Sequence, residues 1–225
     1  ALPILFNSPP YVTAPALYGN RLTYDTLRDL TGVAKFAESP LVLMVPPQSP
    51  HKTVGSLMAA AKASPGKLNF GSGGVASTPH LATAMLENLY GVDMTHVPYK
   101  GGGPSITALM GGETDLLLDS ITTGATFVSG GKLRALAQSG SRRSAKLPEV
   151  PTFAEAGLPQ FQLMHSVGLV ATAKTPLPVL EKLHRAVQKA LAAEDVKARL
   201  AEISAVPALG SRASVNEFQV GRAHV

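Results

Sequence analysis

The stretch from Gly71 to Thr78, GSGGVAST, holds the residue types best suited to binding an anion. It follows a predicted strand and precedes a predicted helix that begins near Pro79. Ser77 and Thr78 are expected to cap this helix, because a hydroxyl can accept a hydrogen bond from an N–H group of the first turn. A helix N-terminus also offers unpaired N–H groups and the positive end of the helix dipole. The stretch therefore predicts a site for a carboxylate or a phosphate, with an ordinary strand-to-helix turn as the alternative.

Two further turns of this kind follow along the chain. Residues 99–105 (YKGGGPS) lead into a predicted helix at 104–110, and residues 119–124 (DSITTG) follow the apolar strand predicted at 115–118. Strands that alternate with helices predict an α/β fold with largely parallel sheets, in which ligands bind beyond the carboxyl ends of the strands. Three such turns at strand ends favour an anion site over three ordinary turns.

Asp119 is the acidic candidate at these turns, because it directly follows the run Leu116–Leu118. An unpaired carboxylate at the end of a buried strand is costly. We therefore expect Asp119 to meet helix N–H groups, a cation or a donor on a ligand. Capping of the next helix is the alternative.

The remaining titratable residues do not predict catalysis or metal binding. The six histidines are never three or four positions apart, which excludes a helical metal pair, and neither a metal nor a cofactor is expected. His80 is expected to donate to a neighbouring carbonyl, with donation to a ligand as the alternative. His96 is expected to be an interior histidine, and His184 to face solvent on its helix. The sequence has no Walker pattern, no G-x-S-x-G and no cysteine nucleophile, so no catalytic residue is assigned from its motifs.

Composition excludes several other classes. The net charge of +5 is dispersed, with Arg142-Arg143 as the one basic pair, so no nucleic-acid partner is expected. Without cysteine the chain can form no disulfide, and this leaves the redox compartment undecided. No apolar run reaches the roughly 18–20 residues of a membrane span. A hydrophobic content of 45% in 225 residues is enough for one large core or two small ones.

Hydrophobic periodicity predicts the elements around the three turns. The run Leu41–Val45, LVLMV, is typical of a strand covered on both faces, and Thr53 is expected to cap a helix at 54–63. Residues 177–193 have the clearest amphipathic pattern, with one apolar stripe. The stripe consists of Leu180, Leu183, Val187 and Leu191.

Several short motifs, taken in order, resemble the extracytoplasmic solute receptors of tripartite tricarboxylate transporters, also called Bug or TctC-type receptors. The resemblance covers nearly the whole chain. The motifs include PGKLNFGS at 65–72, STPHL at 77–81, HVPYKG at 96–101, GGKLRALA at 130–137 and LPEVPT at 147–152.

The resemblance implies the type II periplasmic binding protein fold, in which two α/β lobes are joined by two crossing segments. Residues 1–47 and 168–225 would form the first lobe and residues 48–167 the second. The strand, turn and helix with which the family opens are missing before Ala1, so the chain is expected to be N-terminally truncated and its first lobe incomplete.

The resemblance also implies a function. The protein would be a non-catalytic, monomeric periplasmic receptor that binds a small carboxylate between its lobes and delivers it to the membrane subunits of a transporter. The effector-binding lobe of a LysR-type transcription regulator, which shares the fold, is the alternative. An enzyme on a related scaffold is a third hypothesis.

Site residues carry over from the family by motif. Ser72, Gly73, Ser77 and Thr78 would hold the carboxylate from the second lobe, and Ser8 would face it from the first. The remaining three positions are Gly101 in the second turn, Asp119 near the ligand, and Ser166, where family members often have an aromatic residue.

Overall fold

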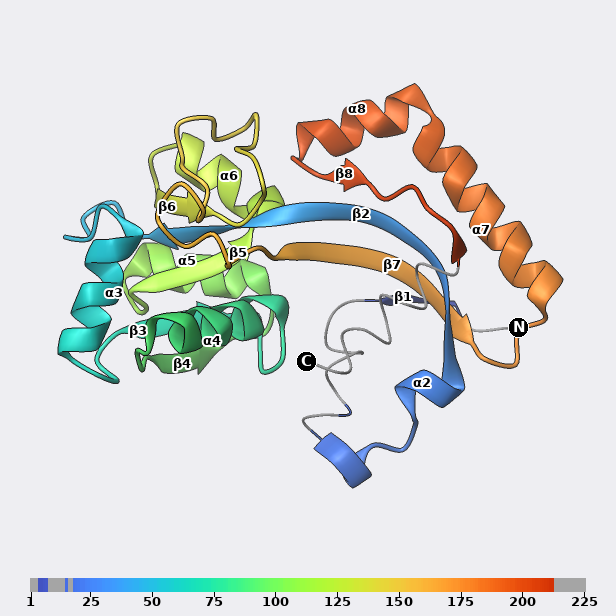
Figure 1. The fold of residues 1–225 in the computed structure, drawn as a ribbon, viewed down its shortest axis with the longest axis horizontal. Coiled ribbons are helices and arrows are strands. Elements are labelled where there is room, and N and C mark those ends of the chain that lie inside the picture. The colour runs from blue at the N-terminus through green and yellow to red at the C-terminus, as the bar shows by residue number, and fades with distance from the viewer. Residues whose placement is uncertain (1–3, 8–14, 16–17, 213–225) are drawn as a thin grey trace. The chain divides into compact units, whose positions relative to one another are not determined.

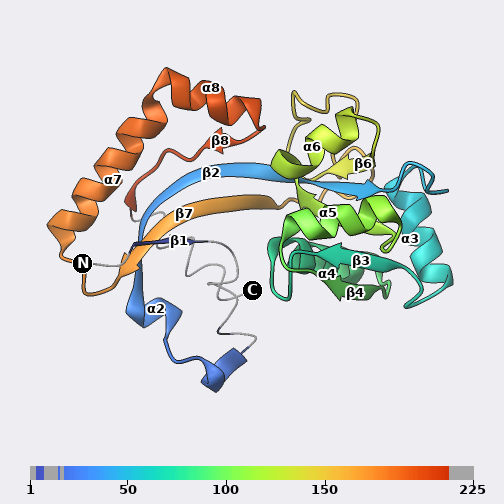
Figure 2. The same cartoon turned by 180° about the vertical axis from the view of Figure 1, so that it is seen from behind.

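The computed structural model describes residues 4–7, 15 and 18–212, and Figures 1 and 2 show their elements from opposite sides. The described chain divides into two compact units. Unit 1 comprises the described residues up to Glu38 and from Ser166 onward, and unit 2 comprises Ser39–His165. Residues 39–47 group with unit 2 because their strand pairs there, whereas the sequence analysis placed them in the first lobe. The predicted lobe boundaries stay a prediction.

Unit 2 is a five-stranded sheet with helices on both faces. Its strands follow the spatial order β6-β2-β5-β3-β4, and β2 enters from unit 1. The elements of unit 2 are the end of β2 (Leu30–Val45), α3 (Val54–Ala63), β3 (Asn69–Ser72), α4 (Thr78–Tyr90), β4 (Thr95–Pro98), α5 (Gly102–Gly111), β5 (Leu116–Ser120), α6 (Ile121–Ser129) and β6 (Arg134–Gln138).

The directions of the strands show that the sheet is mixed. Strand β3 lies between β4 and β5 and is parallel to both, with Phe70 opposite His96 and Leu116. Strand β2 runs antiparallel to β5 and to β6. Strand β6 consequently runs in the same direction as β3, β4 and β5, so the prediction of largely parallel strands holds in unit 2 except for β2. Strand β2 runs opposite to its neighbours although helix α3 joins it to β3, so strand–helix alternation alone did not determine its direction.

The core of unit 2 lies on both faces of β2. Leu41, Leu43 and Val45 pack with α3 and α4, whereas Val42 and Met44 pack with α5 and β5. This alternation follows the two-residue period of a strand, and all five side chains are fully buried. The prediction of a strand covered on both faces is confirmed here, although the strand begins well before the predicted residues.

The helix after β2 confirms a second prediction. Helix α3 covers the predicted residues, with Thr53 as its N-cap. The Thr53 hydroxyl accepts from the Ser56 N–H at 3.1 Å, and the Thr53 N–H donates to the Ser56 hydroxyl at 3.3 Å. This reciprocal pair forms a capping box and satisfies the first turn.

Two strand pairs of unit 1 are antiparallel. Strand β1 (Ile4–Asn7) pairs with β7 (Met164–Thr172), and the short β8 (Val206–Pro207) pairs with β2. The remaining elements are η1 (Gly19–Arg21), α2 (Thr26–Asp29), α7 (Leu177–Ala192) and α8 (Glu194–Glu202). No helix among the described residues is long and apolar enough to cross a membrane.

Helix α7 confirms the predicted apolar stripe. Leu180 is buried against Val33 on β2, and Leu183 and Val187 pack on the same cluster. His184, which was expected to face solvent, is half-buried, with its Nδ1 2.9 Å from the Val33 carbonyl oxygen. That prediction is wrong because the ring lies close enough to the apolar stripe to reach the backbone of β2.

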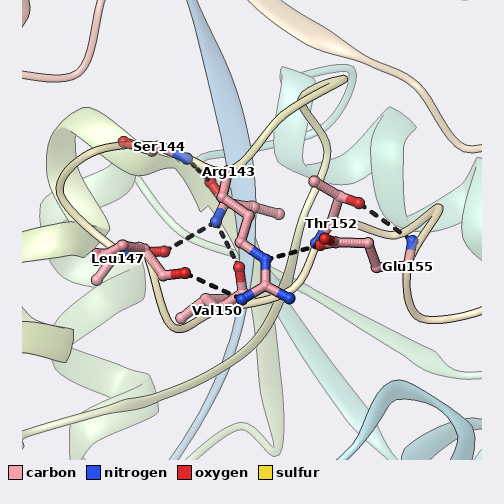
Figure 3. Close-up of polar contacts among 8 residues, drawn as sticks. Arg143, Ser144, Leu147, Val150, Thr152 and Glu155 are labelled. Carbon is pink, nitrogen blue, oxygen red and sulfur yellow. Dashed lines mark hydrogen bonds and ion pairs between the residues drawn. The ribbon is translucent and has the colours of Figure 1, made fainter.

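The loop after β6 is organised by the buried side chain of Gln138, which bonds to three residues of the loop. These three residues, Ser144, Leu147 and Val150, are labelled in Figure 3. The Gln138 amide donates to the carbonyl oxygens of Leu147 at 3.0 Å and Val150 at 2.7 Å, and its own oxygen accepts from the Ser144 N–H at 2.8 Å. One side chain thus provides hydrogen bonds to three backbone groups of a loop that has no regular secondary structure.

Candidate functional site

The three turns singled out in the sequence meet at one edge of unit 2. Strands β3, β4 and β5 run parallel, and they end at Ser72, Pro98 and Ser120. The carboxyl ends of parallel neighbours share an edge, and each strand is followed by a helix, α4, α5 or α6. The prediction that these turns lie together at strand ends is confirmed. We call this region the strand-end site.

Helix α4 begins at the strand-end site without a side-chain cap. Ser77 is its N-cap residue, but its hydroxyl makes no cap bond and donates instead to the Gly74 carbonyl oxygen at 2.7 Å. The Thr78 hydroxyl lies 3.1 Å from Nδ1 of His165. The prediction that Ser77 caps the helix is wrong, because the preceding turn takes up its hydroxyl. The first turn of α4 therefore keeps N–H groups for another acceptor.

Helix α5 begins in the same way, next to the loop that precedes α4. Its N-cap is Gly101, with φ +107° and no side chain to cap the helix. The Gly101 N–H donates to the Gly73 carbonyl oxygen at 3.2 Å. A Cβ atom at Gly73 would lie 3.3 Å from the carbonyl carbon of Gly101, which is tighter than ordinary packing. The two glycines thus bring the α4 and α5 loops into backbone contact.

The Ser72 hydroxyl makes its hydrogen bonds to Gly74 in its own loop and to His96. It lies 2.6 Å from Nε2 of His96, donates to the Gly74 carbonyl oxygen at 3.0 Å and accepts from the Gly74 N–H at 3.1 Å. A hydroxyl has one donor and two acceptor positions, so these three contacts fill it when His96 is the donor. Ser72 therefore holds the loop in shape.

Two histidines stack beneath this loop. The His80 and His96 rings lie 3.9 Å apart, and Phe70 stacks on His96 at 4.9 Å. Nδ1 of His80 accepts from the Ala76 N–H at 3.1 Å. Burial, and then the proximity of His80, lower the pKa of His96 to about 4, and burial also lowers the pKa of His80. Both rings are consequently neutral near pH 7 and serve as packing surfaces.

Asp119 is buried at the end of β5, with only 8% of its surface exposed. Its Oδ1 accepts from the Ser120 N–H at 2.7 Å, and its Oδ2 has no hydrogen-bond partner among the described residues. The helix-capping alternative is not adopted, since the Ser120 hydroxyl caps α6 by accepting from the Thr122 N–H at 3.3 Å. Burial raises the pKa of Asp119, and the hydrogen bond from Ser120 partly opposes this.

The other two predicted site residues do not belong to the described part of unit 2. Ser166 belongs to unit 1, where its buried hydroxyl donates to Oε1 of Glu38 at 3.0 Å, and this oxygen also binds Nζ of Lys35 at 2.8 Å. Ser8 lies outside the described residues. A ligand-binding role for any of the eight residues stays a prediction.

Three residues at this edge were not among the site residues predicted from the sequence. His165 contacts Thr78, and the Ser39 hydroxyl lies 2.9 Å from that of Ser120, which in turn lies 2.8 Å from the Thr122 hydroxyl. Thr122 could have been found in the third turn, but Ser39 and His165 are more than eighty positions from their partners. Among the described residues, no group of His, Asp and Glu is arranged to hold a metal ion.

The family comparison covers almost the whole chain. Residues 2–222 match the family described as "Tripartite tricarboxylate transporter family receptor". A curated relative from Pseudomonas sp. strain P51, "UPF0065 protein in tcbD-tcbE intergenic region", is 38% identical over 92% of this chain and 62% of its own length. The chain spans about three fifths of the length of such curated relatives.

Solved structures agree with this match. MatC from Rhodopseudomonas palustris with bound malate has a TM-score of 0.90 and 30% identity, over 98% of this chain and 76% of MatC. Rpa4515 from R. palustris with adipate has a TM-score of 0.87 and 28% identity, and the periplasmic binding protein BugD has 0.89 and 26%. Each alignment covers 98% of this chain and 74% of the solved one.

These matches confirm the α/β periplasmic-binding-protein fold and agree with a receptor rather than an enzyme. The chain belongs to the receptor family of the tripartite tricarboxylate transporters.

Proposed function

We propose that this chain is the solute-binding part of a periplasmic receptor that binds a small organic carboxylate and delivers it to a tripartite tricarboxylate transporter. One observation carries the proposal. Helices α4 and α5 begin at the same strand edge without side-chain caps, and their loops touch at Gly73 and Gly101.

Two adjacent helix starts suit a carboxylate for a physical reason. A carboxylate has two oxygens with several lone pairs, and it is stabilised by N–H groups and by the positive ends of helix dipoles. The N–H groups of the first helical turns need an acceptor in any case. Binding through backbone groups needs no basic side chain at the site, and it suits ligands that share the carboxylate and differ elsewhere.

The relatives support the remaining parts of the proposal. MatC was solved with malate and Rpa4515 with adipate, both dicarboxylates, and BugD is described as periplasmic. Family membership favours a receptor over the effector lobe of a LysR-type regulator. Delivery to membrane subunits, a monomeric state and the lack of a cofactor are parts of the same proposal.

Titration calorimetry of the protein against mono-, di- and tricarboxylates tests the proposal. We expect saturable heat with at least one compound and an affinity loss of about tenfold or more in Gly73→Ala, where the new methyl group pushes the α4 and α5 loops apart. Gly111→Ala is the matched control, because a Cβ there meets nothing within 4 Å. Absence of heat and of any thermal shift across the panel, with a folded protein, would sink the proposal.

A further inference from the structure

The Asp119 carboxylate has one oxygen with no donor in the described protein. Buried acceptors without a hydrogen bond are rare, because burial removes their hydrogen bonds to water and no protein donor replaces them. Oδ1 is bonded to the Ser120 N–H, but Oδ2 is closed to solvent and unpartnered. No salt bridge is recorded for Asp119 within the part of the chain that the structure describes, and no metal-binding group includes it.

The position of Oδ2 connects it to the strand-end site. A Cβ atom built on Gly102 would lie 3.0 Å from Oδ2, so this oxygen points at the first turn of α5. Helix α5 is ten residues long and begins without a side-chain cap. Because Gly102 has no side chain, the backbone of the first turn of α5 packs directly beside this carboxylate. The acceptor oxygen on β5 therefore lies next to the N–H groups with which α5 begins.

The combination has a chemical consequence. A ligand carboxylate placed on the N–H groups of α5 lies close to a second negative charge, that of Asp119. A further carboxylate directed at Oδ2 would be repelled, whereas a hydroxyl or an ammonium group would supply the missing hydrogen bond. The arrangement thus discriminates between ligands by the group carried next to the bound carboxylate.

We infer that Asp119 accepts a hydrogen bond from the ligand and selects carboxylates that carry a hydrogen-bond donor, a hydroxyl or an ammonium group, beside the bound carboxylate. This inference rests on the proposed carboxylate-binding function. The N–H groups at the helix starts would bind the ligand carboxylate, and Asp119 would accept a hydrogen bond from the neighbouring hydroxyl or ammonium group.

Calorimetry with matched ligand pairs tests the inference. Malate and succinate differ by one hydroxyl group, and aspartate and succinate differ by one ammonium group, so the two pairs separate the two donors. We expect at least one donor-bearing ligand to bind about tenfold or more tightly than succinate, as loss of a hydrogen bond to a buried charge predicts. Lactate and propionate provide the same comparison for monocarboxylates.

Two variants place the preference on Asp119. Asp119→Ala removes the acceptor, and Gly102→Ala covers it with a methyl group while keeping a helical backbone. Both should bring the affinity ratio within a pair close to one, mainly by weakening the donor-bearing ligand. Thr114→Ala is the control, because it removes another unpartnered buried group without touching Asp119. Thermal unfolding of each variant confirms that it is folded.

The outcomes separate the two proposals. If no carboxylate binds, the proposed function fails and the inference fails with it. If carboxylates bind but wild-type protein shows no preference within any pair, the function stands and the inference is overturned. A preference that survives unchanged in both Asp119→Ala and Gly102→Ala also overturns it, because the donor is then recognised elsewhere.

Discussion

The loop after β6, which Gln138 holds, and the strand-end site both belong to unit 2, but they differ in how far their buried polar groups are hydrogen-bonded. Gln138 is fully buried, and each polar atom of its side chain has a hydrogen-bond partner. Along α5, which begins at the strand-end site, and β5, which ends there, three buried oxygens have no partner among the described residues. They belong to Ser105 on α5, Thr114 just before β5 and Asp119 near the end of β5. A network in which every buried polar atom has a partner (a closed network) stabilises a loop. Buried polar atoms without partners (open groups) reduce the stability of the fold and leave hydrogen-bonding atoms for a ligand.

The first test removes the closed network. Gln138→Leu keeps a similar volume but removes the side-chain partner of the Ser144 N–H and of the Val150 carbonyl. The Leu147 carbonyl loses one of its two donors and keeps the Val150 N–H. Because each unsatisfied buried group is costly, we expect the free energy of unfolding to fall by about 3 kcal/mol or more in urea denaturation. Gln160→Leu, at an exposed position, is the control and should change it little. Equal, small effects in both variants would show that the loop is not held by Gln138.

The second test concerns the space around the open groups. A Cβ atom at Gly71 would lie 2.8 Å from the buried Ser105 hydroxyl oxygen, closer than packed atoms approach. Gly71→Ala should therefore lower the free energy of unfolding by about 1–3 kcal/mol. The double variant Gly71→Ala/Ser105→Ala removes the opposing oxygen and should regain most of this loss. If the double variant is no more stable than Gly71→Ala, the loss comes from the backbone rather than from this contact.

The third test uses the histidines beneath the Ser72 loop. The pKa of His96 is about 4 in the folded protein and about 6.5 in an unfolded chain, so the unfolded chain takes up a proton first as the pH falls. This lowers the free energy of unfolding between about pH 6.5 and pH 4, by about 1–2 kcal/mol for a half-buried ring, and has no effect above that window.

Urea denaturation across this pH range measures the effect of His96. His96→Gln should flatten the decline relative to wild-type protein, whereas His51→Gln, which changes a histidine outside the stack, should not. The difference between the variants is the informative quantity, because carboxylates also titrate in this range. Parallel curves for wild-type protein and His96→Gln would contradict the assignment.

Patterns within a few residues predicted where helices and strands lie better than they predicted which strands pair and in which direction. The capped helix after Thr53 and the buried run Leu41–Val45 follow from patterns within a few residues, and the structure confirms both. The antiparallel direction of β2 could not be read in this way, because β2 pairs with strands more than seventy positions later.

The strand-end site shows the same limit. The three turns were predictable, since each is a run of small residues after an apolar strand. The Ser77 cap was predicted wrongly, because the hydroxyl had a competing acceptor at Gly74 that only the folded turn brings near. The unpartnered state of Asp119 could not be predicted either, since it depends on where the first turn of α5 lies.

The smallest expected effect on the free energy of unfolding comes from Ser105→Ala. Its sign shows whether the Ser105 hydroxyl lacks a hydrogen bond or is bonded to an ordered water. Ser105 is fully buried and its hydroxyl is unpartnered, so removing that hydroxyl leaves no protein group unsatisfied. We expect the free energy of unfolding to change by less than about 0.5 kcal/mol, or to rise, because alanine also favours the helix. A loss of about 1 kcal/mol or more would mean that an ordered water binds this hydroxyl, and the strand-end region would then be a closed network like that of Gln138. Ser56→Ala is the matched comparison, since its hydroxyl is bonded in the Thr53 capping box and should cost about 1 kcal/mol.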